Sequence, residues 1–398
     1  MNNNDLLELL KRDSINIFSI KGLEEKINNG KKLRIKLGAD PSKPDLHLGH
    51  SVILRKLRLF QELGHDVIFV IGDFTGMIGD PTGKNKTRPT LTLEETRKNG
   101  ETYFEQVTKI LDPNRTIIKY NSEWLDKLKF NDIINLTSKY TVARILERND
   151  FSIRYHQNQS IGLHEMLYPL IQGYDSVALR ANIEVGGTDQ VFNLLVGREL
   201  QKDYQQEPQE VITFPLLRGL DGVEKMSKSL NNYISINESP HVMFEKCMKI
   251  PDHILLDYFQ LTIDFDFEEA KNLIETDIRK AHYIYANEIV SLYHSKDEAI
   301  NAEKKYKEIT LNIIPSELNS IEIDYIKDMT LINVIRILGF ATSNNEAKKL
   351  IIGKGIKINN IVIEDPFYKF TTDENVIISK GKSNYIRIIF NRIKERIK

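Results

Sequence analysis

Short strand patterns alternate with longer helical patterns in the first third of the sequence, and this alternation limits the possible folds most. Residues 33–37 and 67–71 have strand patterns, and between them residues 46–63 place apolar side chains at roughly helical spacing, with Gly64 as a stop. Residues 92–95, TLEE, form a capping box that opens another helix. Strands that alternate with helices build parallel sheets, so we predict an α/β domain with a doubly wound, Rossmann-like sheet.

The length of the chain indicates more than one domain. Its 398 residues are enough for two or three domains of ordinary size. After residue 232 the pattern changes to helical periods without strands, and from residue 330 onward helical runs are followed by short strands and turns. We predict a Rossmann-like domain over residues 1–232, an α-helical domain over 233–325 and a small α+β domain over 330–398.

The cysteine content and the amino terminus bear on location. Cys247 is the only cysteine, so no internal disulfide and no cysteine-rich zinc site can form, which fits a reducing compartment and implies no zinc. The first residues, MNNND, lack the cationic and apolar parts of a signal peptide, and no apolar run approaches membrane-spanning length. We therefore expect a cytoplasmic protein without a membrane partner.

Charge is distributed unevenly along the chain. The net charge is −1, but residues 331–398 carry 13 Lys and Arg against 6 Asp and Glu, while the preceding residues carry 42 against 50. Nucleic-acid binding depends on local patches of charge rather than on totals. The basic carboxyl end therefore permits an RNA partner.

A histidine motif follows the first predicted strand of this pattern. The segment DPSKPDLHLGH places Asp40 and Ser42 in a loop, and His47, Gly49 and His50 at the start of a helix. Ligands bind at the carboxyl edge of a parallel sheet, and a helix amino terminus attracts phosphate. The glycine lets a nucleotide approach the backbone, and both histidines can hydrogen-bond phosphate oxygens. The motif suits ATP, although two such histidines can also act only as helix caps.

A lysine-rich loop provides the second chemical signal. Residues 225–229 have the sequence KMSKS and follow Gly219 and Gly222, so we expect Lys225 and Lys228 on a loop that the glycines leave free to move. Such a loop can close over a triphosphate and neutralise the charge that develops as pyrophosphate leaves. A lone pair of lysines is more often a solvated basic turn, but the histidine motif upstream favours a nucleotide site.

Three polar side chains share one face of a further predicted helix. Tyr168, Gln172 and Asp175 are spaced at i, i+4 and i+7, and Asp80 lies in a turn close to the second strand. A substrate ammonium group needs acceptors, and a phenol needs an acceptor for its proton. In isolation, Tyr168 and Gln172 would be ordinary residues of a helix surface.

The histidine and lysine motifs resemble the signature elements of class I aminoacyl-tRNA synthetases. The polar helix face, followed by GGTDQ at residues 186–190, resembles the tyrosine pocket of the tyrosyl members, and the resemblance extends over nearly the whole chain. The loop KPD at residues 43–45 matches a second bacterial subgroup. This resemblance implies that ATP, with magnesium, activates tyrosine, that tyrosine is transferred to the 3′ end of its tRNA, and that the protein is a homodimer.

The same resemblance implies a role for each site residue. The ammonium group of tyrosine would be bound by Asp80, Tyr168 and Gln172, and the phenol by Asp175. The ribose and the activated carboxyl group would face Gly187, Asp189 and Gln190. The phosphates would be bound by Ser42, His47 and His50, with Asp40 on the substrate or nucleotide side. The departing charge would be neutralised by Lys84, Lys225 and Lys228.

One position departs from the family pattern. Lys36 stands where many members carry a tyrosine that helps to recognise the substrate phenol. Its ammonium group can donate to the phenol oxygen, or it can point away as a strand residue. Both possibilities stay open at the level of sequence, and Lys36 is kept among the tyrosine-binding candidates.

The carboxyl end resembles the S4 RNA-binding fold. The resemblance rests on SNNEAKKLI at residues 343–351 and GIKIN at residues 355–359. It makes Lys348, Lys349 and Lys357 candidate contacts to RNA phosphates, although each can be part of a solvated face.

Two other functions are possible. The first is that of a tryptophanyl synthetase, and the face formed by Tyr168, Gln172 and Asp175 and the S4-like end argue against it. The second is that of a noncatalytic RNA-binding protein on a synthetase scaffold, and the intact histidine and lysine motifs argue against it.

Overall fold

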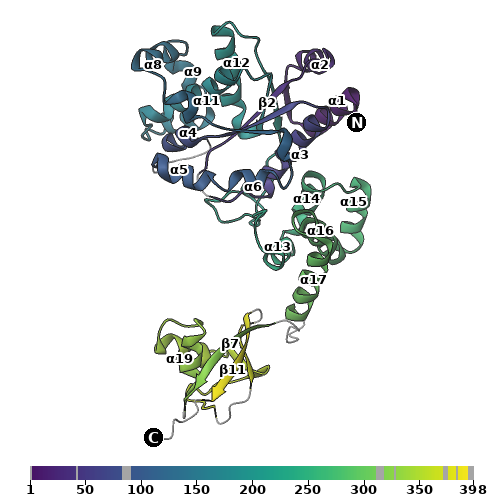
Figure 1. The fold of residues 1–398 in the computed structure, drawn as a ribbon, viewed down its shortest axis with the longest axis vertical. Coiled ribbons are helices and arrows are strands. Elements are labelled where there is room, and N and C mark those ends of the chain that lie inside the picture. Colours follow the sequence, from purple (N-terminus) through teal and green to yellow (C-terminus); the bar gives the residue numbers. More distant parts are fainter. Residues whose placement is uncertain are drawn as a thin grey trace. The chain divides into compact units, whose positions relative to one another are not determined.

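The chain folds into two units, Met1–Tyr293 and His294–Lys398. The computed structural model in Figure 1 describes residues 2–41, 44–82, 91–310, 318–326, 329–370, 375–381 and 384–392.

A six-stranded sheet forms the centre of the first unit. Its strand order is β1-β6-β5-β2-β3-β4, in which β1 is antiparallel to β6 and all other neighbours are parallel. The strands are β1 (Asn16–Phe18), β2 (Arg34–Ala39), β3 (Asp66–Ile71), β4 (Thr116–Tyr120), β5 (Ile183–Gly187) and β6 (Glu210–Phe214). Because β5 and β6 are buried along their whole length, the sheet is of the doubly covered, parallel kind. The predicted Rossmann-like sheet is confirmed.

Helices cover both faces of this sheet, with α11 and α12 on one side and α5 and α6 on the other (Figure 1). The helices up to residue 203 are α1 (Asn3–Asp13), α2 (Ile20–Asn28), α3 (Leu48–Glu62), α4 (Asp73–Ile78), α5 (Leu93–Gly100), α6 (Tyr103–Val107), α7 (Ser122–Leu125), α8 (Phe130–Thr137), α9 (Val142–Leu146), α10 (Asn149–His156), α11 (Leu163–Leu179) and α12 (Val191–Asp203).

Local sequence explains the ends of two of these helices. Helix α3 begins after its N-cap residue His47, and the chain turns at Gly64, whose φ of +88° favours glycine. Helix α5 begins with a capping box, in which the Thr92 hydroxyl accepts from the Glu95 N–H and the Glu95 carboxylate accepts from the Thr92 N–H. Both predicted helices are confirmed.

The strand order reverses between β5 and β2. From β2 the chain continues to β3 on one side, and from β5 it continues to β6 on the other, so the segments that leave their carboxyl ends diverge and leave a crevice. The β2 end leads to α3, and the β5 end leads through a 3-10 turn (Thr188–Gln190) to α12. The sheet topology therefore brings the histidine motif and the GGTDQ segment to one crevice.

Four helices complete the first unit: α13 (Pro240–Cys247), α14 (Leu255–Thr262), α15 (Phe267–Thr276) and α16 (Ile278–Tyr293). Helix α16 packs against the other three, and α14 packs on α3. The buried rings of Tyr258 and Phe259 contact the ring of Tyr285, with centroids 5.8 and 5.3 Å apart. These helices support α3, whose amino end borders the crevice. No helix in the described part of the chain is both long enough and apolar enough to cross a membrane.

The second unit begins with α17 (Lys296–Thr310) and contains a five-stranded sheet of order β7-β11-β10-β8-β9. Its other elements are β7 (Asn319–Tyr325), α18 (Leu331–Ile337), α19 (Asn344–Ile352), β8 (Ile356–Ile358), β9 (Ile361–Val362), β10 (Val376–Lys380) and β11 (Asn384–Arg392). Apolar side chains of both helices and of the sheet form one core, which includes Leu331, Val334, Ile351, Ile378 and Ile388. The predicted small α+β domain is confirmed.

The predicted end of the helical domain is wrong. Residues 319–325 were expected in that domain, but they form β7, which pairs in parallel with β11. Ile321 and Ile323 alternate with Glu322 and Asp324, and this two-residue period is that of a strand. The division into two units also separates α13 to α16 from α17.

Candidate active site

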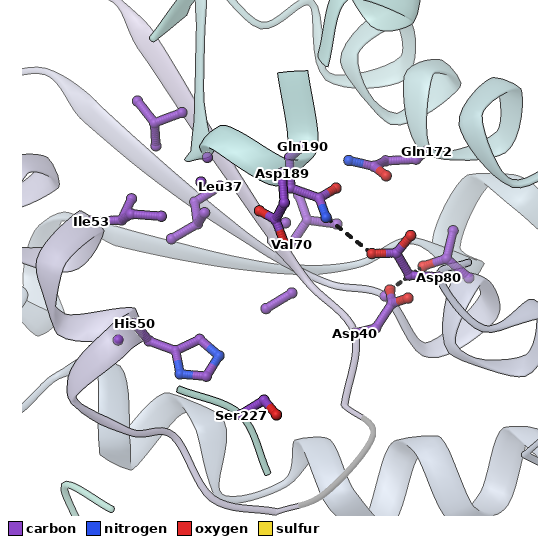
Figure 2. A pocket seen from close by; sticks show the side chains of 18 of the residues that line it. Leu37, Asp40, His50, Ile53, Val70, Asp80, Gln172, Asp189, Gln190 and Ser227 are labelled. Atoms are coloured by element: carbon purple, nitrogen blue, oxygen red, sulfur yellow. Dashed lines mark hydrogen bonds between the residues drawn. The ribbon is translucent and has the colours of Figure 1, made fainter. Parts of the chain in front are cut away.

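A cavity of about 640 Å³ lies at the carboxyl ends of β2, β3 and β5. Figure 2 shows side chains that project into it from α3, from the β2 and β5 ends and from the 225–229 loop. The predicted site residues that line it are Asp40, His47, Gly49, His50, Asp80, Tyr168, Gln172, Asp175, Gly187, Asp189, Gln190, Lys225 and Lys228. The fold thus brings together segments that are up to about 190 residues apart.

One face of α11 forms one end of the cavity, where Tyr168, Gln172 and Asp175 all line the wall. The Tyr168 hydroxyl donates to Asp40 Oδ2 at 2.8 Å, and the Thr75 hydroxyl donates to Asp40 Oδ1 at 2.6 Å. Asp40 therefore connects α11 with the end of β2. Its carboxylate is a suitable acceptor for a substrate ammonium group.

A second set of hydrogen bonds spans the cavity. Gln190 Nε2 donates to Asp80 Oδ2 at 3.0 Å (Figure 2), and the main chain and hydroxyl of Thr82 donate to Asp80 Oδ1 at 2.9 and 2.6 Å. Asn193 Nδ2 donates to Gln172 Oε1 at 3.1 Å and to Gln190 Oε1 at 3.2 Å. Asn193 was missed at the level of sequence, although it lies one helical turn after Gln190. It fixes the orientation of both amides.

Asp175 is buried at the far end of the α11 face. Its carboxylate accepts hydrogen bonds from Trp124 Nε1 at 2.8 Å and from Asn121 Nδ2 at 3.3 Å. Burial raises the pKa of Asp175 to about 7, and the positive charge of Lys36 and the two hydrogen bonds oppose this rise. Trp124 and Asn121 were also missed, because no local pattern links them to a residue about 50 positions later.

The two histidines lie against each other at the amino end of α3. Their ring centroids are 3.9 Å apart, and the His47 main-chain N–H donates to His50 Nδ1 at 3.2 Å. Burial, followed by the charge of Lys228, lowers the pKa of His50 to about 3, and burial also lowers the pKa of His47 well below its usual value. A Cβ atom at Gly49 would lie 3.0 Å from the His47 ring. Both rings are therefore neutral at pH 7, and His50 carries its proton on Nε2 because Nδ1 is an acceptor.

The 225–229 loop carries two lysines, both of which line the cavity and have different partners. Lys225 Nζ lies 2.5 Å from Asp189 Oδ2, after the end of β5. Lys228 Nζ donates to the Tyr103 hydroxyl at 2.6 Å and lies 5.0 Å from the centroid of the Tyr103 ring. Met226, between them, is 5% exposed. The whole loop lines the cavity, with the Lys225 ammonium group at Asp189 and the Lys228 ammonium group at Tyr103.

The glycines before this loop lie in close contact with neighbouring residues or in a turn. A Cβ atom at Gly219 would lie 2.2 Å from Asn232 Nδ2, and Gly222 has a φ of +74°. The Ser227 N–H donates to Asn232 Oδ1 at 2.8 Å, and Asn232 Nδ2 donates to the Lys225 carbonyl at 3.2 Å. The glycines thus make room for Asn232 and a left-handed turn, and Asn232 bonds the main chain of the loop at Lys225 and Ser227.

Lys36 is the one described member of the tyrosine-binding candidates that does not line the cavity. Its side chain is fully buried, and its Nζ lies 2.8 Å from Glu184 Oε1. The same ammonium group donates to Ser176 Oγ at 2.9 Å and to the Gln172 carbonyl at 3.3 Å. Lys36 therefore lies beneath the α11 face, and this arrangement does not offer the direct contact with tyrosine that the sequence left open.

The remaining candidates lie elsewhere. Ser42 and Lys84 fall outside the described residues. In the second unit, Lys348 and Lys349 lie on α19 and Lys357 on β8, and Lys348 Nζ is 5.1 Å from the centroid of the Phe367 ring. Within the described ranges, no group of three or more His, Cys, Asp or Glu side chains is placed to hold a metal ion.

Two family models match the chain. The model of class I tRNA synthetases (W and Y) matches residues 28–310, and the S4 domain model matches residues 329–376. Among curated relatives, a tyrosine–tRNA ligase of Deinococcus radiodurans is 48% identical over 97% of this chain and 96% of the relative. A tyrosine–tRNA ligase of Thermotoga maritima is 44% identical over 96% of each chain.

Solved structures share the fold. A tyrosyl-tRNA synthetase of Archaeoglobus fulgidus, solved with L-tyrosine, has a TM-score of 0.62 at 22% identity and covers 76% of this chain and 99% of its own. A truncated mitochondrial tyrosyl-tRNA synthetase of Aspergillus nidulans has a TM-score of 0.63 at 21% identity, over 77% of this chain and 94% of its own. With its cavity, its two motifs and these matches, the chain belongs to the class I tRNA synthetase family (W and Y) and carries an S4 domain.

Proposed function

We propose that this chain activates tyrosine with ATP and transfers the tyrosyl group to the 3′ end of tRNA(Tyr). The observation that carries the proposal is one cavity in which an acceptor-rich face of α11 adjoins two neutral histidines and two loop lysines. The named relatives, which are 44–48% identical over nearly the whole chain, support tyrosine as the amino acid.

In the first step, a tyrosine carboxylate oxygen attacks the α-phosphorus of ATP. A new oxygen–phosphorus bond forms, and the bond from this phosphorus to pyrophosphate breaks. Asp80, Tyr168 and Gln172, together with Asp40, would hold the substrate ammonium group, and Asp175 would accept the phenol hydrogen bond. The step needs orientation and charge stabilisation rather than a nucleophilic side chain.

The nucleotide side would stabilise the departing charge. His47 and His50 would donate hydrogen bonds to phosphate oxygens, and Lys225 and Lys228 would neutralise the pyrophosphate as it leaves. Lys84 and Ser42 are kept in this set by resemblance alone. ATP would enter with Mg²⁺, which supplies charge neutralisation at the phosphates, and the phosphate oxygens rather than a protein cluster would provide most of its ligands.

In the second step, the terminal ribose hydroxyl of tRNA attacks the carbonyl carbon of tyrosyl-adenylate, and AMP leaves. Residues 1–232 would carry both reactions, and the helices after residue 233 would meet the anticodon arm. The S4 domain would contact RNA phosphates through Lys348, Lys349 and Lys357. These contacts would position the RNA without reading its sequence.

A homodimer and a cytoplasmic location are further parts of the proposal. Large apolar side chains are exposed along α8 to α11, where Phe130 and Leu163 are 81% and 80% exposed and Val142 and Tyr155 are 62% and 60% exposed. Apolar groups gathered on one run of helices are typical of a protein–protein interface. A second copy of the chain is the partner we propose.

The decisive experiment is amino-acid-dependent ATP–pyrophosphate exchange without tRNA. We expect exchange with tyrosine and not with phenylalanine or tryptophan. Exchange with tryptophan alone would replace the assigned substrate, and no exchange with any amino acid would favour a noncatalytic RNA-binding protein. Charging of tRNA(Tyr) by the same preparation then tests the second step.

A further inference from the structure

Lys36 and Glu184 form a buried ion pair directly beneath the α11 face. The Lys36 and Glu184 side chains are 0% and 2% exposed, and their charged atoms are 2.8 Å apart. Glu184 lines the cavity floor and Lys36 lies behind it. Burying two charges is costly unless every donor and acceptor is satisfied, so such a pair must be closely fitted to its surroundings.

The Lys36 ammonium group has three N–H donors and three acceptors. These acceptors are Glu184 Oε1, Ser176 Oγ at 2.9 Å and the Gln172 carbonyl at 3.3 Å. No donor is left for a substrate phenol. Two of the three acceptors belong to α11, and they flank the turn that carries Asp175.

The Glu184 carboxylate also has several hydrogen-bond partners. Its Oε2 accepts from Ser176 Oγ at 2.8 Å and from Gln209 Nε2. A Cβ atom at Gly197 of α12 would lie 3.1 Å from Ser176 Oγ and 3.4 Å from Glu184 Oε2, so α12 closes over this group of side chains. The ion pair therefore links β2 and β5 to one turn of α11, and α12 packs closely against it at Gly197.

We infer that the Lys36–Glu184 ion pair positions the Gln172–Asp175 turn of α11 and thereby sets the discrimination between tyrosine and phenylalanine. The inference rests on the proposed function. A site with a fixed acceptor for the substrate hydroxyl rejects an analogue that lacks it, because the buried acceptor is then left unpaired; tyrosine-specific synthetases are a known example of this effect. Lys36 and Glu184 are positioning residues, because their charged groups bond each other and Ser176 and so act through α11.

The test compares Lys36→Met, Glu184→Gln and the Lys36→Met/Glu184→Gln double variant. The double variant removes both charges and keeps an amide for Ser176 and Gln209, so it is expected to fold, whereas Lys36→Met alone leaves a buried carboxylate without its cation and is expected to melt at a lower temperature. In pyrophosphate exchange, the double variant is expected to raise the KM for tyrosine about tenfold or more while the KM for ATP changes less than about threefold.

The ratio of kcat/KM for tyrosine to kcat/KM for phenylalanine is the quantity that tests the inference most specifically. We expect the ratio of the two kcat/KM values to fall by at least about tenfold in the double variant. Lys26→Met is the matched control, because Lys26 is also buried, lies 3.6 Å from Glu210 and does not line the cavity. It is expected to lower the melting temperature and leave the tyrosine preference unchanged.

The outcomes separate the two proposals. A double variant with the wild-type KM for tyrosine and the wild-type preference would overturn the inference and leave the proposed function intact. Equal increases in the KM for tyrosine and in the KM for ATP would overturn it too, because they would indicate a general disturbance of the cavity. A wild-type chain without tyrosine-dependent exchange would overturn the proposed function, and this inference with it.

Discussion

The Tyr168 hydroxyl donates a hydrogen bond to Asp40 Oδ2 over 2.8 Å and so joins helix α11 to the carboxyl end of β2. Asp40 also accepts a hydrogen bond from Thr75, within α4. The Asp40 carboxylate therefore contacts α11 through Tyr168, and Asp40 itself lies on the segment that leads from β2 to the histidine motif. We expect the binding of an ammonium group at Asp40 to order both sides of the site together.

Removing the Tyr168 hydroxyl tests this relationship. Tyr168→Phe keeps the ring and loses a hydrogen bond to a charged group, which is worth about 1.5–3 kcal/mol. We therefore expect kcat/KM for tyrosine to fall about 10- to 100-fold in pyrophosphate exchange. Tyr174→Phe, on the same helix but outside the cavity lining, is the control and should change kcat/KM less than about twofold. Equal effects of the two substitutions would contradict the role of the hydroxyl.

Tyrosine binding is expected to weaken in acid. The pKa of Asp175 is raised to about 7, first by burial, and the ionised form is the one that accepts a phenol hydrogen bond. Below this pKa a proton competes with the substrate, so the KM for tyrosine should rise by up to about tenfold per pH unit. Kinetics measured from roughly pH 5.5 to roughly pH 8.5, where most proteins are near their maximal stability, follow this effect. A KM that is flat below pH 7 would show that the protonated acid also binds tyrosine.

The charge of Glu184 contributes to the same pKa. Glu184 raises the pKa of Asp175 and Lys36 lowers it. Glu184→Gln removes the negative charge and leaves the positive one, so the rise in the KM for tyrosine should begin at a lower pH than in the wild type.

Because the pKa of Asp175 in the folded chain lies above its unfolded value, its contribution to stability is present at low pH and is lost as the pH rises through about 7. Thermal unfolding of the wild type and of Asp175→Asn at pH 5 and pH 8, roughly either side of this value, checks the sign. The melting temperature of the wild type relative to that of the variant should be higher at about pH 5 than at about pH 8.

His50 is expected to act as a neutral donor. Its pKa is lowered to about 3, and its Nδ1 accepts the His47 N–H, so Nε2 carries the proton at pH 7. Gln places an amide nitrogen near that position, whereas Ala removes the donor. His50→Ala should therefore lower the rate of adenylate formation by about 100-fold or more, and His50→Gln by clearly less. Single-turnover measurements distinguish them, and equal losses would argue against a donor role.

Lys228 is expected to act on the reaction more than on tyrosine binding. Lys228 lines the cavity, and its ammonium group donates to the Tyr103 hydroxyl over 2.6 Å. Lys228→Ala should slow adenylate formation by about 100-fold, while the Kd for tyrosine changes less than about threefold. The exposed Lys202 is a control, since Lys202→Ala removes a charge away from the cavity. A large change in the Kd for tyrosine with a normal rate would refute this role.

Periodicity in the sequence was sufficient to predict those features that depend on one segment. The spacing of Tyr168, Gln172 and Asp175 places them on one face of α11 because a helix has 3.6 residues per turn. The alternation of strands and helices predicts a parallel sheet, whose topology brings the carboxyl ends of its strands to one edge. The β7 strand was missed because its two-residue period covers only seven residues and its partner, β11, lies about 60 residues later.

The direction of individual side chains depends on contacts between distant segments, so sequence left it open. Lys36 had two possible orientations, and the choice is made by Glu184 and Ser176, about 140 residues away, whose oxygens satisfy its donors. Trp124 and Asn121 gain their importance only because α7 lies beside Asp175. Such pairs have no local signature, since neither residue type nor spacing specifies the partner.

The basic residues of the S4 domain provide the last prediction. Replacing Lys348, Lys349 and Lys357 by alanine should lower kcat/KM for tRNA in aminoacylation by at least about tenfold, because each ammonium group that is removed no longer attracts a phosphate. The dependence of log kcat/KM on log salt concentration should become shallower by about one for each phosphate that is no longer bound. Exchange without tRNA should be unchanged, because the second unit has its own core. A control with the same change in charge replaces three exposed lysines of the first unit: Lys21, Lys31 and Lys32. If this control weakens charging as much, total charge rather than the S4 surface determines tRNA binding.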